Sequence, residues 1–462
     1  MIAIPNPLAG AARANPQGVA VQTEQGALGY AALREQVALA ADVLQQKGVG
    51  LGDRVAILGA PSLGWVVAFH AVGWLGAIAQ PVPQNPGGQA LLTWLNQAES
   101  DWLLSDEALP PGWLDKGIAL ELAGGEHPVA ERDWPLDEVR LEVASSGTTG
   151  QPRMVSLSVT QLVFGALGSA LRLGHLPGDV WLCCLPLHHV GGLSILLRCA
   201  WYGTTVLLQP RFDSAAVAQA MAGGGITHVS LVPTMLSDVL EEGLQAHERL
   251  RVVLLGGANA PQALLEKCRK VSLPVALTWG MTETASQVTT RSPGELDAGE
   301  DVGAPLAFAR VVDGVDGGLV VQGPVAPEGS YQTRDIGRVD DQGRVLLEGR
   351  VDDLIVSGGE NIHPALVESV LEAHPAILAA VVVAREDVRW GQRPVAWLEA
   401  ADPQDLPAPE NLQEWCARNL KRFEVPDAFR WADSLPRTEL GKRLRSEVRR
   451  REAALTQTGE DY

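Results

Sequence analysis

The chain has 462 residues, of which 46% are hydrophobic and 20% are charged. These proportions are ordinary for a soluble globular protein, and at roughly 150 residues per domain the length suggests about three units. The formal net charge of −19 argues against a nucleic-acid partner, which would favour a basic face. An anionic ligand must therefore be bound by local cationic or backbone groups, because the field of the whole protein repels it.

The five cysteines indicate reduced thiols, because their number is odd and no pair has the spacing of metal ligands. No basic segment followed by a long apolar run marks a secretory signal at the N-terminus. The longest apolar stretch, from Leu63 to Ala79, contains His70 and falls short of the ~20 residues that cross a bilayer, so it predicts a buried helix. We therefore expect a soluble cytoplasmic protein without a transmembrane segment.

Helical and strand patterns alternate along the first two thirds of the chain. Apolar residues at helical spacing from Arg34 to Lys47 end at Gly48, and a short strand pattern follows from Arg54 to Leu58. Strands of Val, Ile and Leu that alternate with helices predict a mostly parallel α/β sheet. The same order recurs at 214–221 followed by 228–232, and at 261–270 followed by 275–278.

The pattern changes at about residue 303 and again near Asp352. Short β segments punctuated by glycine indicate a small β subdomain at about 303–349. A helix at 364–373, a strand at 377–383 and a helix at 411–419 then indicate a smaller α+β unit, and the polar tail after Arg450 is expected to fray. We therefore expect an N-terminal domain of residues 1–351 and a C-terminal domain of residues 352–462.

The strongest local signal is a loop rich in serine, threonine and glycine. Its glycines free the backbone to wrap an anion, and its hydroxyls can donate hydrogen bonds to phosphate oxygens. The Walker pattern is not met, because the fifth residue after Gly147 is Pro152, and an ordinary surface loop is the alternative interpretation. The candidate phosphate-binding residues are Ser145, Ser146, Gly147, Thr148, Thr149, Gly150 and Arg153.

This loop resembles the first phosphate loop of the superfamily that contains acyl-CoA synthetases, adenylation domains and luciferases. The chain departs from the family's motifs at Arg153, where lysine is usual, and at Arg334, where glycine is usual. The resemblance implies a large α/β N-terminal region and a small mobile α+β C-terminal domain that rotates about a hinge at Asp352. Segments that resemble the later motifs follow in the family's order, at 185–192, 255–258, 279–284, 331–335, 349–353, 357–362 and 435–442.

The resemblance implies an enzyme that joins a carboxylic acid to coenzyme A and cleaves ATP to AMP and pyrophosphate. Charge on the transferring phosphate must be neutralised by a metal, by cations and by backbone N–H groups. On this interpretation Glu283 is a Mg²⁺ ligand, Thr282 binds the α-phosphate and Lys442 bridges the carboxylate and the phosphate. Taken alone, Glu283 is more typical of a solvated surface carboxylate, and a solvated lysine at the end of a turn is the alternative interpretation of Lys442.

The same resemblance assigns the nucleotide contacts. Trp279 would stack on adenine, where the family usually has tyrosine or phenylalanine, and Gly257 and Ala258 would lie against the same base. Asp335 would accept hydrogen bonds from both ribose hydroxyls, with Arg350 beside it. A buried core tryptophan and a β-turn aspartate are the alternative interpretations of these residues.

The resemblance also implies two reactions in one active site, reached by rotation of the C-terminal domain. In one arrangement Lys442 enters the cleft. In the other, Gly358 and Gly359 line a tunnel for the pantetheine arm of coenzyme A, and Trp390 flanks it. Trp390 could equally be a packing residue.

Three segments are similar to the o-succinylbenzoate–CoA ligases of menaquinone synthesis: 188–196, 281–287 and 357–364, of which the last also occurs in benzoate-type ligases. Such an acid carries a second carboxylate and a ketone, so its pocket needs polar or cationic groups. The candidates are Arg198, Ser286, Gln287 and His189, of which His189 is also a gating aromatic beside the reacting groups.

Alternatives remain open at this point. The acid could be another aryl acid or a medium-chain fatty acid, or the chain could load a carrier protein. From a different class, it could be a nucleotide-binding regulator that has lost catalysis. The oligomeric state, including a homo-oligomer, stays open as well.

Overall fold

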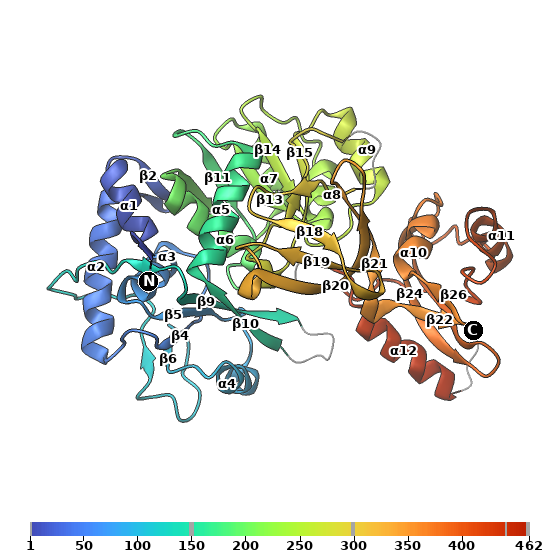
Figure 1. Cartoon of the computed structure of the whole chain (residues 1–462), viewed down its shortest axis with the longest axis horizontal. Coiled ribbons are helices and arrows are strands. Elements are labelled where there is room, and N and C mark those ends of the chain that lie inside the picture. Colours follow the sequence, from blue (N-terminus) through green and yellow to red (C-terminus); the bar gives the residue numbers. More distant parts are fainter. Residues whose placement is uncertain (1, 147–151, 297–300, 439–440, 459–462) are drawn as a thin grey trace.

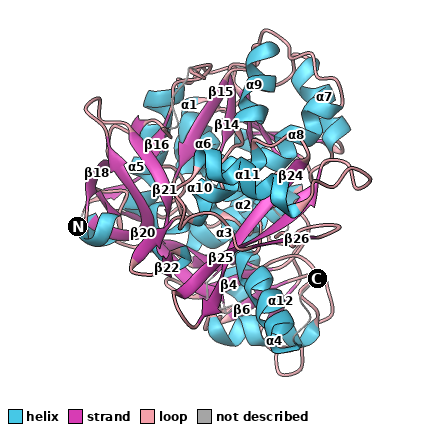
Figure 2. Ribbon diagram, turned by 90° about the vertical axis from the view of Figure 1, so that its right-hand side faces the viewer, coloured by secondary structure: helices cyan, strands magenta, loops and turns pink. Residues whose placement is uncertain are grey.

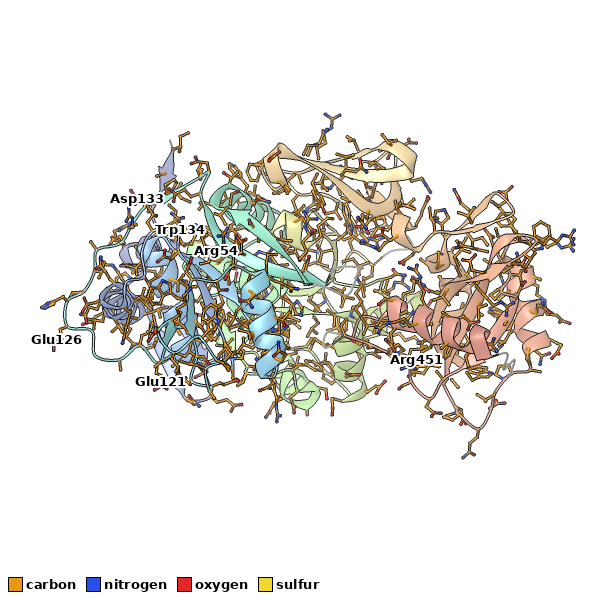
Figure 3. The ribbon with its side chains drawn as sticks, turned by 90° about the horizontal axis from the view of Figure 1, so that it is seen from below. Arg54, Glu121, Glu126, Asp133, Trp134 and Arg451 are labelled. Atoms are coloured by element: carbon orange, nitrogen blue, oxygen red, sulfur yellow. The ribbon has the colours of Figure 1, made fainter. Side chains whose placement is uncertain are left out.

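The computed structural model describes residues 2–146, 152–296, 301–438 and 441–458. Figure 1 shows a large N-terminal part and, at one end of the long axis, a smaller unit formed by the last hundred residues. In Figure 3, Arg54 and Trp134 lie in the large part, and Arg451 lies in the smaller unit. The expected α/β class is confirmed.

The first parallel sheet has the strand order β10-β9-β5-β4-β6-β7. All its neighbours are parallel except β10, which pairs antiparallel with β9. The two strands flank the predicted phosphate loop, so the loop starts and ends at one edge of this sheet. The strands are β4 (Arg54–Ile57), β5 (Ile78–Pro81), β6 (Trp102–Leu104), β7 (Gly117–Ile118), β9 (Val139–Ser146) and β10 (Pro152–Ser158), and α4 (Gly88–Gln97) follows β5.

The apolar stretch after β4 forms helix α3 (Leu63–Leu75), as predicted. Ser62 caps its N-terminus by accepting a hydrogen bond from the backbone N–H of Trp65, and Gly76 ends it in the left-handed conformation. The helix is buried nearly all round, and Trp134 donates from its indole nitrogen to the Gly73 carbonyl (3.0 Å). Among the described residues no helix combines the length and the apolar character needed to span a bilayer.

The large sheet has the strand order β17-β16-β15-β14-β13-β11-β12-β2-β3, and its central strands β15 to β12 and β2 are parallel. Its strands are β2 (Val19–Thr23), β3 (Gly26–Gly29), β11 (Val180–Cys183), β12 (Thr205–Leu208), β13 (His228–Leu231), β14 (Val252–Leu255), β15 (Val275–Trp279), β16 (Thr289–Thr290) and β17 (Ala304–Pro305). Its helices are α1 (Pro7–Ala14), α2 (Tyr30–Lys47), α5 (Val159–Leu173), α6 (Val190–Tyr202), α7 (Ser214–Ala222), α8 (Pro233–Glu241) and α9 (Gln262–Lys270), and the short strands β1 (Ala3–Ile4) and β8 (Trp134–Pro135) pair separately.

Apolar residues cover both faces of the large sheet, as a buried parallel sheet requires. Along β14, Val252 and Leu254 belong to one hydrophobic cluster, whereas Val253 and Leu255 belong to another. Because successive side chains of a strand point to opposite faces, the two clusters lie on opposite sides of the sheet. The helix–strand order read from the sequence is therefore confirmed.

The β subdomain is an antiparallel sheet with the order β18-β19-β20-β21. A buried ion pair joins it to the large sheet: Arg291, just after β16, binds Asp301 through Nη2 and Oδ2 (2.7 Å) and through Nε and Oδ1 (3.0 Å). Asp301 forms a bridge with Leu346 of β21. The strands are β18 (Arg310–Asp313), β19 (Gly318–Gln322), β20 (Ser330–Val339) and β21 (Val345–Arg350).

The strands of the C-terminal unit all follow Asp352, where the sequence places the domain boundary. Figure 2 looks onto this unit, with α10 and α12 against β24. The expectation that the tail after Arg450 frays is wrong, because α12 continues to Thr458 and is held by the buried Val448 and by a hydrogen bond from Trp397 Nε1 to Glu452 (2.9 Å). The elements are β22 (Ile355–Ser357), β23 (Glu360–Ile362), α10 (Pro364–Glu372), β24 (Ile377–Asp387), β25 (Gly391–Ala400), α11 (Pro409–Asn419), β26 (Ala428–Trp431) and α12 (Arg445–Thr458).

The Arg291–Asp301 ion pair yields a stability prediction. Asp301→Asn keeps the shape of the side chain but leaves the buried Arg291 without its counter-charge, which should destabilise the protein by about 3 kcal/mol. Urea unfolding followed by tryptophan fluorescence measures the change. Glu348→Gln, which removes the exposed Arg338–Glu348 pair, is the matched control and should have little effect. Equal shifts in the two variants would contradict the assigned role.

Candidate active site

The candidate residues gather at the carboxyl edge of the large sheet. Trp279 ends β15, and Gly257 follows β14 in the left-handed conformation (φ 83°), with Ala258 exposed beside it. Helix α8 begins just after β13, and 184–189 follow β11. Ligands of open α/β sheets bind at this edge, so the topology supports a nucleotide site here.

A chain of hydrogen bonds crosses from the large sheet to the β subdomain. Trp279 Nε1 donates to Asp335 Oδ2 (3.0 Å), and Arg350 Nη1 donates to Asp335 Oδ1 (2.9 Å). Asp335 and Arg350 face each other because they are register partners on β20 and β21. Three residues predicted separately to bind one nucleotide are thus in direct contact.

Lys442 lies on a segment that is anchored on both sides. The backbone N–H of Thr438 donates to the Lys442 carbonyl (2.8 Å), and the Lys442 N–H donates to Thr438 Oγ1 (3.1 Å). Arg437 binds Glu399 (2.7 Å), and Arg443 binds Glu372 and the Ala380 carbonyl. The C-terminal sheet and α10 therefore hold the base of the Lys442 side chain in a defined place.

The Lys442 segment abuts the N-terminal domain at the start of α8. A Cβ atom added to Gly441 would lie 2.1 Å from Thr234 Oγ1, and Gly441 has a φ of +73°. Only glycine fits this position, because both the backbone conformation and the close approach exclude a side chain. The contact brings Lys442 over the carboxyl edge of the large sheet, and it was not expected from the sequence.

The surroundings of Lys442 lower the pKa of its ammonium group. Although part of its side chain stays accessible to solvent, loss of hydration in the cleft and the neighbouring Arg350 lower the pKa of its ammonium group, while Asp335 and Asp353 oppose this shift. Lys442 of the C-terminal domain is therefore electrostatically coupled to Asp335 and Arg350 of the β subdomain. Charged groups of the C-terminal unit and of the β subdomain thus lie close together.

Glu283 lies in a short 3-10 turn, Thr282–Thr284, directly after β15. The buried Gln161, whose Oε1 accepts from the Ser158 N–H at the start of α5, donates to the Glu283 carbonyl (2.8 Å). Thr282 is half-buried in the same turn. The sequence analysis did not single out Gln161. The capping-box spacing of Ser158 and Gln161 was the signal that could have predicted a structural role for it.

Tyr331 is a second residue that sequence reasoning left without a role. Its phenol lies close enough to the Glu283 carboxylate for the two groups to interact. Burial and then Glu283 raise the pKa of Tyr331, while Arg153 and Arg334 lower it, so these charges lie around one phenol. One carboxylate and two cations are thus gathered beside the nucleotide site. Among the described residues no group of three or more His, Cys, Asp or Glu side chains could hold a metal by itself.

The turn after Glu283 has an unusual backbone. Ala285 and Ser286 have φ values of 55° and 103°, and a Cβ atom on Gly280 would lie 1.6 Å from the Ser286 carbonyl oxygen. Consecutive non-glycine residues in this region are strained, and such strain clusters at functional sites. The turn places Ala285 against the cavity described next.

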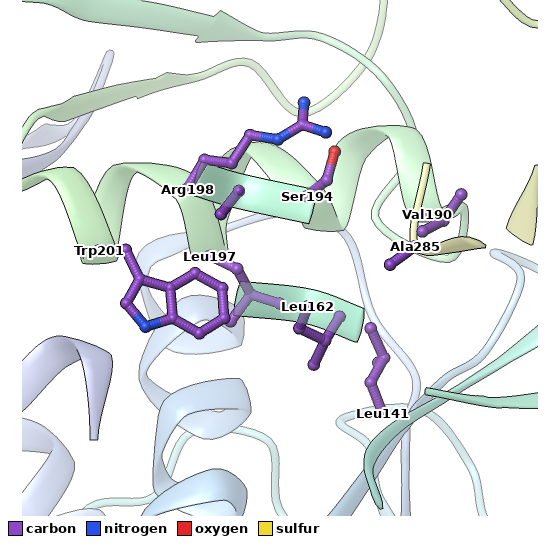
Figure 4. Close-up of a pocket in the computed structure, with 9 residues that line it drawn as sticks. Leu141, Leu162, Val190, Ser194, Leu197, Arg198, Trp201 and Ala285 are labelled. Carbon is purple, nitrogen blue, oxygen red and sulfur yellow. The ribbon is translucent and has the colours of Figure 1, made fainter. Parts of the chain in front are cut away.

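A small, mostly apolar cavity of about 10 Å³ lies beside this turn and is partly open to solvent. Arg198 of α6 lies at its wall, is only 2% exposed, and has no hydrogen-bond partner for Nη2. Burial lowers the pKa of this guanidinium. Figure 4 shows Arg198 and Ser194 on one side and Leu141 and Leu162 on the other. A buried guanidinium with an unpaired donor is a candidate partner for an anionic group of a ligand.

The other predicted acyl-site residues lie outside the lining of this cavity. His189 precedes α6 and stacks on the buried His188 (4.3 Å between ring centroids), whose pKa is lowered by burial to about 4. The Gln287 amide donates to Thr290 Oγ1 (2.8 Å) inside the sheet. Arg198 is therefore the predicted residue that the fold brings to the cavity, and the roles of His189, Ser286 and Gln287 stay predictions.

Arginines hold the predicted hinge from both sides. Asp352 accepts from Arg334 of β20 (2.7 Å) and lies 3.7 Å from Arg350 of β21. Asp353 pairs with Arg445 at the start of α12 (3.2 Å) and with Arg449 one turn further along the helix (2.9 Å). Each of the two consecutive aspartates is thus bound by a different domain.

Gly358 and Gly359 form the tight turn between β22 and β23, with φ values of 60° and 87°. Two-residue hairpin turns require such values and therefore favour glycine. Trp390 packs directly on Gly358, because a Cβ atom there would lie 2.7 Å from its Cε3, and Arg389 stacks on the indole (4.9 Å). Trp390 is 45% exposed, so this surface faces solvent.

The predicted phosphate loop falls partly outside the described residues. Gly147, Thr148, Thr149 and Gly150 are not described, and of Ser146 only the backbone is. Ser145 Oγ donates to the Arg153 carbonyl (3.1 Å), which closes the base of the loop between β9 and β10.

Comparison with known proteins identifies the family. The profile of the AMP-binding enzyme family matches residues 8–330, and that of the AMP-binding enzyme C-terminal domain matches residues 366–442. The chain belongs to the AMP-binding enzyme family. The 2-succinylbenzoate–CoA ligase of Bacillus cytotoxicus is 35% identical over 97% of this chain and 99% of that protein.

A solved relative is similar in structure to this AMP-binding enzyme. The o-succinylbenzoate CoA synthetase of Bacillus subtilis bound to its acyl-adenylate intermediate has a TM-score of 0.90 and 33% identity, covering 97% of this chain and 98% of that chain. Its complex with ATP and magnesium gives 0.89 and 32%, covering 97% and 100%. A double mutant of it bound to a product analogue gives 0.73 and 33%, covering 97% and 99%.

The contact between Gly441 and α8 yields a prediction for this AMP-binding enzyme. Gly441→Ala should lower ATP–pyrophosphate exchange roughly 100-fold, because the clash with Thr234 displaces the Lys442 segment from the site. Gly343→Ala is the matched control: Gly343 has a similar φ of +76°, but nothing lies near its added Cβ. Thr234→Ala in the Gly441→Ala chain should restore part of the exchange. Equal losses in the two glycine variants would show that backbone strain alone is responsible.

Proposed function

We propose that this chain is an ATP-dependent 2-succinylbenzoate–CoA ligase, which forms an acyl-adenylate and then an acyl-CoA thioester. The observation that carries the substrate is the buried, partly unpaired Arg198 in an apolar cavity beside the turn that bears Glu283. An acid with two carboxylates matches the chemistry of this site, because one carboxylate can react while the other pairs with Arg198. The near full-length similarity to ligases of this name supports the same substrate.

The first reaction is attack of the acid carboxylate on the α-phosphorus of ATP, with release of pyrophosphate. Lys442 stabilises the negative charge where carboxylate and α-phosphate meet, and the turn at Thr282 contributes hydrogen bonds to the phosphate. Asp335 binds the ribose hydroxyls, Trp279 and Gly257 border the adenine, and Arg153 lies near the phosphates. These assignments rest on the contacts around Asp335 and Lys442.

Magnesium fits the residues around Glu283. Mg²⁺ binds through one or two carboxylates together with nucleotide phosphates, and the site offers the Glu283 carboxylate with the Tyr331 phenol and Arg153 beside it. When bound, the ion neutralises charge on the phosphates. Glu283 would hold it, and Tyr331 would orient the carboxylate.

The second reaction is attack of the coenzyme A thiol on the acyl carbonyl of the acyl-adenylate, which forms the thioester, breaks the acyl–phosphate bond and releases AMP and the thiol proton. We propose that rotation about Asp352 withdraws Lys442 and brings Gly358, Gly359 and Trp390 to the cleft. Two observations support this rotation. The Gly358–Trp390 surface faces solvent in this structure, and the TM-score falls from 0.90 for the adenylate complex of the Bacillus subtilis relative to 0.73 for its product-analogue complex.

Arg198 also weighs against a medium-chain fatty acid, because an apolar tail would leave the buried cation unpaired. Another aryl acid with a second anionic group stays the alternative substrate. A cytoplasmic location and a homo-oligomeric state remain predictions from the sequence.

A pyrophosphate-release assay with ATP, coenzyme A and a panel of acids tests the function. We expect turnover with 2-succinylbenzoate and at least 100-fold lower kcat/KM with benzoate or octanoate, because these acids leave Arg198 without its partner. Faster turnover with either acid would refute the substrate, and no ATP–pyrophosphate exchange with any acid would refute the ligase itself.

Arg198→Met keeps the apolar volume of the side chain and removes its charge. It should lower kcat/KM for 2-succinylbenzoate by about 100-fold, because the free carboxylate loses a buried partner. Activity with mono-acid analogues should change little; 4-oxo-4-phenylbutanoate lacks the ring carboxylate and 2-butanoylbenzoate lacks the chain carboxylate. The analogue that turns over identifies the reacting carboxylate. A uniform loss on the diacid and on the accepted analogue would mean that Arg198 only supports the fold.

A further inference from the structure

We propose that Trp279 is a positioning residue for the ribose: its indole N–H orients the Asp335 carboxylate and thereby makes the enzyme select a nucleotide with ribose hydroxyls. The inference rests on the proposed function, because it takes Asp335 as the ribose-binding group. It assigns to Trp279 a role beyond stacking on adenine, which any aromatic ring could perform.

Two donors fix the orientation of the Asp335 carboxylate, and they leave part of its capacity to accept hydrogen bonds free. Trp279 Nε1 donates to Oδ2 (3.0 Å) and Arg350 Nη1 donates to Oδ1 (2.9 Å), one donor on each oxygen. A carboxylate offers about four lone-pair sites, so about one remains free on each oxygen. Two free acceptor sites in a fixed plane match the two neighbouring hydroxyls of a ribose.

The Trp279 ring is held rigidly, so its N–H has a defined direction. Trp279 is 7% exposed and packs in a cluster with Val311, Leu319 and Val345 of the β subdomain. The N–H of such a ring must have a partner, because a buried unpaired donor is costly. Asp335 is that partner. Phenylalanine at position 279 would provide the ring face but no donor.

Trp279 and Arg350 differ in what else they touch. Arg350 is 37% exposed and also lies 3.7 Å from the hinge residue Asp352. The Trp279–Asp335 hydrogen bond joins two residues that both precede the hinge. A rotation at Asp352 can therefore change the contact between Arg350 and Asp352, whereas the Trp279–Asp335 hydrogen bond does not involve the hinge residue. We therefore expect Trp279 to keep Asp335 oriented in both half-reactions.

Equilibrium binding tests the inference without turnover. Isothermal titration calorimetry compares ATP with 2′,3′-dideoxy-ATP in the absence of acid and coenzyme A, for the wild-type chain and for Trp279→Phe. We expect the substitution to weaken ATP binding about tenfold or more, the typical effect of losing a hydrogen bond to a charged group. Binding of the dideoxy nucleotide, which does not use the ribose contacts, should change by less than about twofold.

Trp397→Phe is the matched control. Trp397 Nε1 also donates to a carboxylate, Glu452 (2.9 Å), in the C-terminal unit. This variant loses the same kind of bond and should keep the full preference for ATP. If Trp279→Phe does not fold, 3-benzothienylalanine at position 279 is nearly isosteric with tryptophan, carries sulfur in place of the N–H, and should give the same loss.

The outcomes distinguish a failure of the role assigned to Trp279 from a failure of the ribose assignment of Asp335. A wild-type chain that binds the two nucleotides equally would overturn the ribose assignment of Asp335 and this inference together. A wild-type chain that prefers ATP, with a Trp279→Phe variant that keeps the preference or weakens both nucleotides equally, would overturn the inference alone. Selective loss of ATP affinity in the variant would support it.

Discussion

The contacts of the Arg350 guanidinium with Asp335 and Asp352 are the interactions on which the arrangement of this enzyme's site depends. The guanidinium binds Asp335 on one side and reaches Asp352 on the other, so one side chain connects the proposed ribose site to the hinge. The Lys442 ammonium feels the charges of Arg350 and Asp335 at the same place. The proposed ribose site, the proposed hinge and Lys442 are thus electrostatically connected, although Lys442 lies far along the chain from the other residues.

A hinge at Asp352, as we propose, must hold each arrangement of the domains and also release it. Asp352 binds arginines of the β subdomain and Asp353 binds arginines of α12, all at least partly exposed. Exposed ion pairs contribute little each, about 1 kcal/mol or less, so several of them can define one arrangement without locking it. The buried Arg291–Asp301 pair differs in kind, because it joins two parts of the same domain that do not need to separate.

Local cations solve the problem posed by a protein with a net charge of −19 that must bind anions. Arg153 and Arg334 lie around Tyr331 and Glu283, and Lys442 and Arg350 lie at Asp335. Arg198 is placed apart from these, inside an apolar cavity where its charge is least screened. Such separation allows the phosphates and the free carboxylate of the acid to be recognised by different groups.

The sequence by itself determined the fold class, the family and most of the elements. Short-range patterns carry this information: helical spacing, runs of β-branched residues, and motifs whose residues are neighbours in the chain. Helix α12 was missed, because its anchors, Trp397 against Glu452 and the buried Val448, come from contacts across the C-terminal unit. The tertiary structure alone decided which distant residues meet. It paired Trp279 with Asp335, set Gly441 against Thr234, and left Arg198 buried with a free donor while Gln287 bonds within the sheet. These contacts depend on strand register and on domain packing, and no local pattern of residues encodes either of them.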